Sequence, residues 1–256
     1  MEERLPHRAW FVPRTSWLPA LLAAWLMLVV ASPIGGTPVI EAAETNLKGV
    51  DVSHWNGQVN WRAARDDGVR FVIAKATEGR TFVDSEYVRN RAKADELGLR
   101  FTAYHFARPS GGARDARLEA DHFVRTAKLN GGHLVPVLDL EVTGGLGRDR
   151  LTTWVRAWLE QVESHLGVKP MIYTSPSFWK DRMANTTWFA NNGFDALWIA
   201  HWFASEPRVP ASNWSGAGWT LWQITNCGRL RGFDGCVDVD LHQGTDIGRL
   251  TIDNRR

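Results

Sequence analysis

Short apolar segments alternate with amphipathic segments between residues 48 and 182. The clearest amphipathic segment spans 151–166, where apolar residues recur at helical spacing and Gly167 follows as a helix stop. A regular alternation of strands and helices is typical of a parallel sheet covered by helices. The predicted strands are 48–52, 69–74, 99–105, 134–141 and 169–174, and the predicted helices are 61–67, 85–97 (with Ser85 as N-cap), 113–128, 151–166 and a short one near 175–182.

The pattern changes after residue 185. Three further apolar segments, 196–202, 219–225 and 237–241, are predicted to be strands, but the links between them are rich in Gly, Pro, Asn and Ser. Together the segments predict an α/β fold, a modified TIM-like barrel with about five βα units followed by three strands with few helices. Because no internal repeat or second module is visible, residues 44–256 are expected to form one domain.

The first 43 residues have the pattern of a targeting segment. Three arginines within the first 14 residues precede an apolar segment, 17–31, which is short for a membrane span. We expect a signal peptide that is cleaved after Ala31 or near Ala42–Ala43. The alternative is an uncleaved anchor in the inner membrane. Either reading predicts an exported chain, periplasmic or secreted.

Composition narrows the function classes. The formal net charge is only +2, and the sequence has no dense Lys/Arg patch, which argues against nucleic-acid binding. The 14 tryptophans outnumber the 3 tyrosines; most should pack in the core, but a few at a cleft would suit sugars. Cys227 and Cys236 lie in one Gly-rich loop and are expected to form a disulfide. No further soft ligands accompany them, so we expect no metal and no cofactor.

Acidic residues follow the predicted strands at the end where such barrels hold their active sites. Asp139 and Glu141 come after the apolar segment 134–138 and point to the same face, since they are two apart on a strand. Two like charges raise the pKa of one group, which could then act as a general acid. Taken alone, the pair could equally be a solvated strand end. Asp51 and Asp238 favour the functional reading, because the first and eighth strands of a closed barrel are neighbours.

The residues at these strand ends belong to eight short motifs. The motifs are, in order, Gly49-Val-Asp-Val-Ser-His-Trp55, Ala74-Lys-Ala-Thr-Glu-Gly79, Tyr104-His-Phe-Ala-Arg-Pro109, Leu138-Asp-Leu-Glu141, Tyr173-Thr-Ser-Pro-Ser-Phe-Trp179, Leu197-Trp-Ile-Ala-His-Trp202, Leu221-Trp-Gln-Ile224 and Val237-Asp-Val-Asp240. Together they resemble glycoside hydrolase family 25, the muramidases also called Chalaropsis-type lysozymes, and the resemblance runs from about residue 48 to residue 244.

The resemblance implies hydrolysis of the β-1,4 bond between N-acetylmuramic acid and N-acetylglucosamine in peptidoglycan. It implies that Glu141 is the general acid, that Asp139 is its companion, and that Asp51 and Asp238 are two further active-site acids. The sequence departs from the family's pattern at Asp240, where Asn is common. The second carboxylate could activate water, act as nucleophile or orient the substrate's own N-acetyl group. The resemblance favours the last, with Asp139 as the orienting residue.

Six further residues are expected to contact substrate. Trp55 and Trp202 are candidate sugar platforms, and His105 and His201 are expected to be hydrogen-bonded residues of the barrel mouth, with no paired spacing to suggest a metal. The six expected contacts are Trp55, Tyr104, His105, Tyr173, Trp202 and Asp240.

Two functions other than that of a muramidase are compatible with such a barrel. A sugar-binding protein with an inactive site would lack one of the acids, and all four are present. A glycosidase acting on another amino-sugar polymer such as chitin would be expected to carry a longer acidic motif, but residues 134–137 are Leu-Val-Pro-Val. We expect a monomer that acts on glycan strands without an obligate protein partner, with a membrane tether only if the N-terminal segment is retained.

Overall fold

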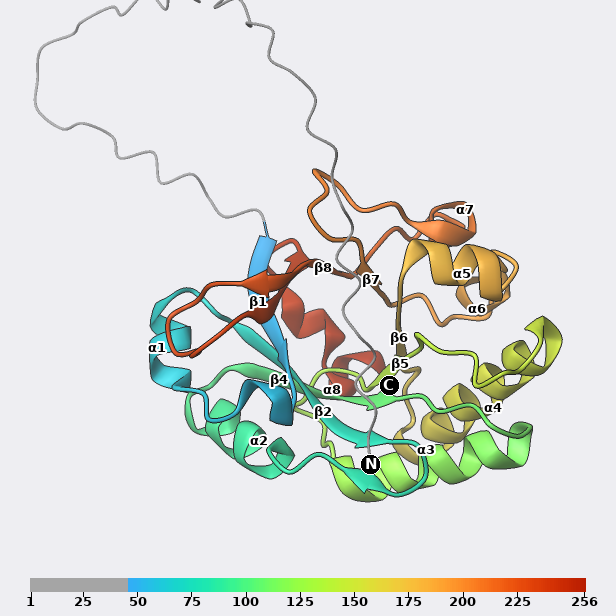
Figure 1. Cartoon of the computed structure of the whole chain (residues 1–256), viewed down its shortest axis with the longest axis horizontal. Coiled ribbons are helices and arrows are strands. Elements are labelled where there is room, and N and C mark those ends of the chain that lie inside the picture. Colours follow the sequence, from blue (N-terminus) through green and yellow to red (C-terminus); the bar gives the residue numbers. More distant parts are fainter. Residues whose placement is uncertain (1–45) are drawn as a thin grey trace, which may run out of the picture. The chain divides into compact units, whose positions relative to one another are not determined.

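The computed structural model describes residues 46–256 (Figure 1). The predicted targeting segment, 1–43, lies outside the described residues. No helix within residues 46–256 combines the length and the apolar character that crossing a membrane requires.

The described residues form a closed barrel of eight strands, which confirms the predicted fold class. The strands are hydrogen-bonded in the order β1-β9-β8-β7-β6-β5-β4-β2, and pairing of β1 with β2 closes the barrel. A short strand, β3, pairs antiparallel with the end of β2. The strands are β1 Asn46–Val52, β2 Phe71–Glu78, β3 Phe82–Val83, β4 Arg100–Phe106, β5 Val137–Asp139, β6 Met171–Thr174, β7 Leu197–Ala200, β8 Leu221–Gly228 and β9 Val237–Gln243.

The barrel is mixed, because β9 runs antiparallel to both of its neighbours, β1 and β8. The other neighbouring strands of the barrel are parallel, so their carboxyl ends share one end of the barrel. At that end β9 begins. Asp238 is therefore at the start of its strand, and the prediction that it follows a strand's carboxyl end is wrong.

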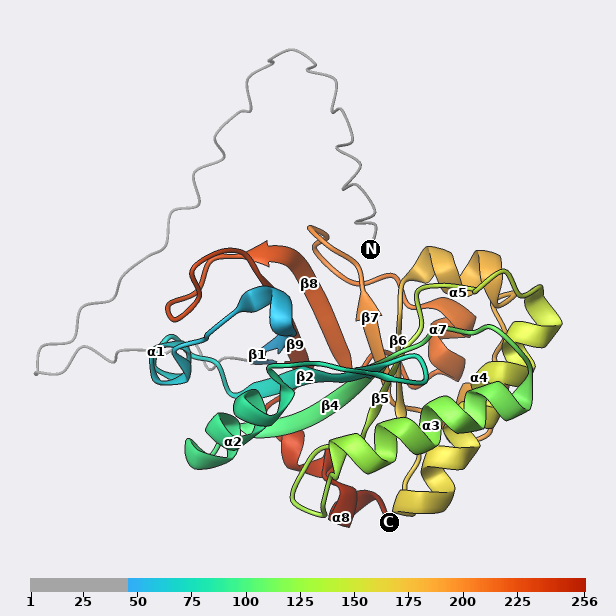
Figure 2. The same cartoon turned by 60° about the horizontal axis from the view of Figure 1, so that its bottom comes forward.

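Helices cover the outside of the early strands, and α3 and α4 lie side by side (Figures 1 and 2). The helices of the second half are short, as the sequence predicted. The helices are α1 Trp61–Asp66, α2 Tyr87–Glu96, α3 Ala113–Ala127, α4 Arg148–Leu166, α5 Pro176–Arg182, α6 Trp188–Asn191, α7 Pro210–Ser215 and α8 Ile252–Arg255, with 3-10 turns η1 His54–Asn56 and η2 Ile247–Leu250.

Most predicted boundaries differ from the observed ones by a few residues, as for the strand predicted over 69–74, which is β2 Phe71–Glu78. Ser85 does not cap α2; the helix begins at Tyr87, and the Asp84 carboxylate accepts a hydrogen bond from the backbone N of Glu86. The strand predicted over 134–141 is shorter, so Glu141 lies two residues beyond β5.

The core has two layers, separated by the barrel wall. Side chains alternate along each strand, so Met171 and Tyr173 of β6 belong to the interior cluster and Ile172 belongs to the cluster under the helices. Ile247 and Ile252, near the C-terminus, also pack against the interior cluster. The predicted disulfide is confirmed: Cys227 and Cys236 are bonded, with their Cα atoms 4.4 Å apart, and link the end of β8 to the segment before β9.

Candidate active site

The acidic pair lies at the end of β5 and is fixed by β6. Asp139 is the last residue of β5 and is buried, whereas the Glu141 side chain is exposed. Between them, Leu140 donates its backbone N–H to the Tyr173 carbonyl (3.0 Å) and accepts from Thr174 Oγ1 (3.1 Å). These two bonds hold the backbone of the loop that presents Glu141 to solvent.

The two carboxyl groups lie close enough that each shifts the pKa of the other. Burial raises the pKa of Asp139 well above its ordinary value, and the charge of Glu141 raises it further. Surrounding protein atoms also raise the pKa of Glu141, although solvent reaches its side chain, whereas Asp139 and Lys75 lower it. Asp139 Oδ1 is buried and finds no N–H or O–H donor among residues 46–256. The pair therefore keeps a proton to higher pH than two separate acids would.

A second carboxyl cluster occupies the start of β9. Asp51 and Asp238 are direct partners in the β1–β9 pairing, as the sequence predicted, and the charges of Asp238 and Asp240 raise the pKa of Asp51. Trp198 Nε1 donates to Asp240 Oδ1 (2.8 Å). Burial, reinforced by repulsion among the acids, raises the pKa of Asp238 to about 6 and those of Asp51 and Asp240 well above their ordinary values.

Gln223 connects this cluster to the rim of the barrel. Its Oε1 accepts hydrogen bonds from the Tyr173 hydroxyl (2.9 Å) and from Trp202 Nε1 (2.7 Å). Its Nε2 donates to Asp51 Oδ2 (2.6 Å). Sequence reasoning did not count Gln223 among the site residues. Its position at the end of a strand was the available signal, but the sequence does not show how many partners a side chain has.

Aromatic side chains surround the acids. Tyr173 and Tyr104 pack on Trp198 inside the barrel, with ring centroids 4.3 Å and 6.5 Å from it. Burial and the nearby carboxylates raise the pKa of both tyrosines, so each keeps its hydroxyl proton. Trp202 is 43% exposed and Trp55 67% exposed, which leaves area on both for a sugar ring.

The structure does not bring His105 to the mouth. Its side chain has no exposed surface, and the ring nitrogens contact Thr77 Oγ1 (2.8 Å) and Glu119 Oε2 (2.9 Å). The ring stacks on Trp158 of α4, with centroids 5.4 Å apart. His105 therefore lies between the barrel wall and the helices, and the expectation that it contacts substrate is corrected: it has no surface to offer.

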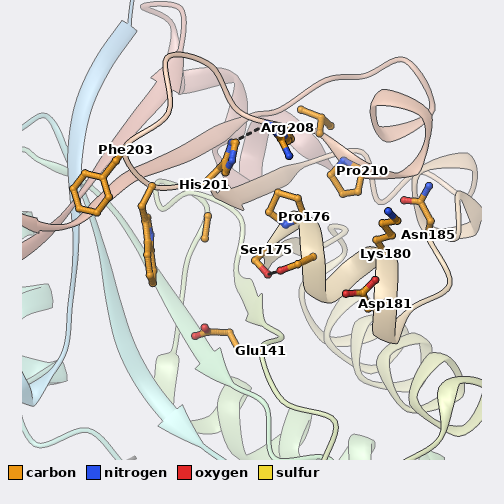
Figure 3. A pocket seen from close by; sticks show the side chains of 14 residues that line it. Glu141, Ser175, Pro176, Lys180, Asp181, Asn185, His201, Phe203, Arg208 and Pro210 are labelled. Atoms are coloured by element: carbon orange, nitrogen blue, oxygen red, sulfur yellow. Dashed lines mark hydrogen bonds between the residues drawn. The ribbon is translucent and has the colours of Figure 1, made fainter. Parts of the chain in front are cut away.

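A cavity of about 880 Å³ opens beside Glu141. Figure 3 shows Glu141 at one end of it, with side chains from α5 and from the segment between β7 and α7 opposite. Within residues 46–256, no group of three or more His, Cys, Asp or Glu side chains has the arrangement of a metal site. The cavity is lined by Glu141, Ser175, Pro176, Ser177, Lys180, Asp181, Asn185, Ala200, His201, Trp202, Phe203, Arg208, Val209 and Pro210.

Comparison with known proteins matches the chain to a protein family. The family model described as "Glycosyl hydrolases family 25" matches residues 50–233. Lysozyme M1 of Streptomyces globisporus is 33% identical over 229 residues, which cover 83% of this chain and 73% of that protein. An N,O-diacetylmuramidase of Arthroderma benhamiae is 32% identical over 83% of this chain and 94% of its own length.

A solved structure agrees in fold. The crystal structure of the bacterial lysozyme from Streptomyces coelicolor superimposes with a TM-score of 0.75 at 29% sequence identity, covering 82% of this chain and 99% of that one. The barrel, its acid-lined end and the family match lead to one conclusion: the chain belongs to glycosyl hydrolases family 25 and is a glycoside hydrolase.

Proposed function

We propose that the protein is a lysozyme, an N-acetylmuramidase that hydrolyses the β-1,4 bond between N-acetylmuramic acid and N-acetylglucosamine in peptidoglycan. The observation that carries this proposal is Glu141, exposed in a cavity two residues from the buried Asp139, with each acid shifting the pKa of the other. The names of the similar proteins, lysozyme and muramidase, support the choice of substrate.

In this proposal Glu141 gives its proton to the glycosidic oxygen as the bond to the sugar's C1 breaks. The carbonyl oxygen of the substrate's own N-acetyl group attacks C1 and forms a cyclic oxazolinium ion. Asp139 accepts a hydrogen bond from the N–H of that group and so orients it. Water then opens the ring after losing a proton to Glu141, which restores the enzyme.

In the free protein the interaction between the two acids raises the pKa of Asp139 and lowers that of Glu141, so the pair's proton favours Asp139. The proposal therefore requires the proton to be on Glu141 when substrate is bound, which leaves Asp139 as the carboxylate that the N-acetyl group needs. Lys75 supports that charge, since it lowers the pKa of both acids while pairing with Glu78. Asp51 acts through Gln223, which positions the Tyr173 hydroxyl and the Trp202 ring at the rim.

We also propose that residues 1–43 direct export, either as a cleaved signal peptide or as an inner-membrane anchor. The disulfide between Cys227 and Cys236 supports an oxidising compartment outside the cytosol. The substrate lies in the same compartment.

The test is the clearing of purified cell walls by a Glu141→Gln variant. Gln keeps the shape of the side chain but cannot donate the proton, so the rate should fall by roughly 10²–10⁴-fold. Glu160→Gln is the matched control, because Glu160 is an exposed acid on α4 paired only with Arg156 among the described residues. Near-normal clearing by Glu141→Gln, with an unchanged melting temperature, would remove Glu141 from the mechanism.

A further inference from the structure

The cavity beside Glu141 extends away from the acids that the mechanism uses. Asp51, Asp139 and Asp238 do not line it; its walls come from β6–α5 and from the segment between β7 and α7. Its volume of about 880 Å³ lies in the upper part of the range of ligand pockets, roughly 300–1,000 Å³. The cavity therefore shares Glu141 and Trp202 with the proposed glycan site.

Two cations face this cavity without a protein partner. Within residues 46–256, the side chains of Lys180 and Arg208 form no ion pair and no side-chain hydrogen bond, although the backbone N of Arg208 donates to His201 Nδ1 (3.1 Å). Asp181 is the one other charged residue in the lining besides Glu141. Figure 3 shows Lys180 and Arg208 on the walls across the cavity from Glu141. Unpaired cations in a cavity suit carboxylates, which Arg binds in a bidentate manner.

The walls that carry these cations hold a strained backbone. Asn185 and Phe203 line the cavity with φ of 52° and 56°. Left-handed backbone costs L-residues roughly 1–2 kcal/mol each and persists mostly at functional sites. Asn185 Oδ1 accepts a hydrogen bond from the backbone N of Ala211 (2.7 Å) and so ties the two walls together.

The chemistry of the substrate supplies a ligand for this cavity, if the function proposed above holds. A muramidase cleaves at C1 of the muramic acid, so that sugar lies next to Glu141. The lactyl group on the same ring carries the peptide stem, which must leave the cleft close to Glu141. Peptide stems carry free carboxylates. We propose that the cavity binds the peptide stem of the muramic acid residue and that Lys180 and Arg208 pair with its carboxylates.

The experiment compares two substrates: peptidoglycan glycan strands with their stems, and the same strands after an amidase has hydrolysed the lactyl amide, which removes the stem and leaves only the lactyl carboxylate. The measured quantity is kcat/KM for the wild type and for the Lys180→Ala/Arg208→Ala double variant. The variant should lose roughly 10–100-fold on stem-bearing strands, as expected for charge-assisted hydrogen bonds, and stay within about twofold of the wild type on bare strands.

Two further variants make the result specific. Lys180→Arg/Arg208→Lys keeps both charges and should recover most of the activity on stem-bearing strands. Arg100→Ala removes an exposed cation at the start of β4, far along the barrel from the cavity. This variant should leave kcat/KM unchanged on both substrates. Equal losses on the two substrates, or no loss on either, would overturn the proposal. A wild type that cleaves neither substrate would instead overturn the proposed function.

Discussion

Asp139 and Glu141 are separated by a single residue whose backbone is bonded to β6, and this spacing gives one buried and one exposed carboxyl. The surroundings of the two carboxyl groups, and not their residue types, decide which role each acid takes in the proposed mechanism. The sequence placed all four acids correctly at one end of the barrel. It misplaced His105, because Tyr104 and His105 both end a strand, and successive strand residues point to opposite faces. Only Tyr104 enters the barrel interior.

Removing the charge of Asp139 tests its role as the orienting carboxylate. In Asp139→Asn, Glu141 can still donate a proton, but the N-acetyl group loses its carboxylate partner. We expect the rate of cell-wall hydrolysis to fall by about 100-fold or more, with substrate affinity little changed. Steady-state kinetics on soluble glycan fragments would check this. A kcat equal to that of the wild type would show that Asp139 takes no part in the reaction.

The raised pKa of Asp238 predicts that the stability of the fold depends on pH. Its pKa is raised from 3.8 to about 6 on folding, so its protonated form stabilises the fold. This contribution is complete below pH 3.8 and is lost as the pH rises through about 6. Asp238→Asn removes the effect, so its melting temperature relative to the wild type should rise by roughly 5–10 °C between pH 4.5 and pH 7.5. Thermal unfolding at both pH values measures the difference, and a difference independent of pH would contradict the raised pKa.

The sequence predicts β9 as a strand, but it does not predict that β9 runs antiparallel to its neighbours. A period of two in the apolar pattern is the same in both directions, so it carries no polarity. The link between β8 and β9 did carry the information, because a short connection without a helix cannot make the crossover that a parallel neighbour needs. That reversal brings Asp238 and Asp240 to the acid-lined end. The short strand β3 was not predicted, since a two-residue segment has no pattern to detect.

The disulfide closes this hairpin, and its removal should destabilise the fold. The two cysteines are 9 positions apart, for which loop-closure entropy gives about 2–3 kcal/mol. A Cys227→Ser/Cys236→Ser variant should therefore melt roughly 5–10 °C lower than the oxidised wild type. Differential scanning calorimetry would measure this, with reduced wild type as the matched comparison. Equal melting temperatures for all three samples would show that the bond does not stabilise the hairpin.

The whole molecule combines a barrel that the sequence predicted well with a cavity that it did not predict. The barrel follows from local patterns of strands and helices. The cavity is built from Glu141, Lys180 and Arg208, which lie far apart along the chain on separate elements. No local pattern relates such residues, so only the folded chain shows that a cationic wall faces the proposed acid.

The most direct test of the muramidase assignment is the identity of the new reducing end. Purified peptidoglycan would be digested with the wild-type protein, the products reduced with borohydride, and their masses and fragmentation measured, with a Glu141→Gln digest as the blank. The account predicts that the reduced sugar is muramitol, because cleavage occurs at C1 of N-acetylmuramic acid. Products that end in reduced N-acetylglucosamine would contradict it.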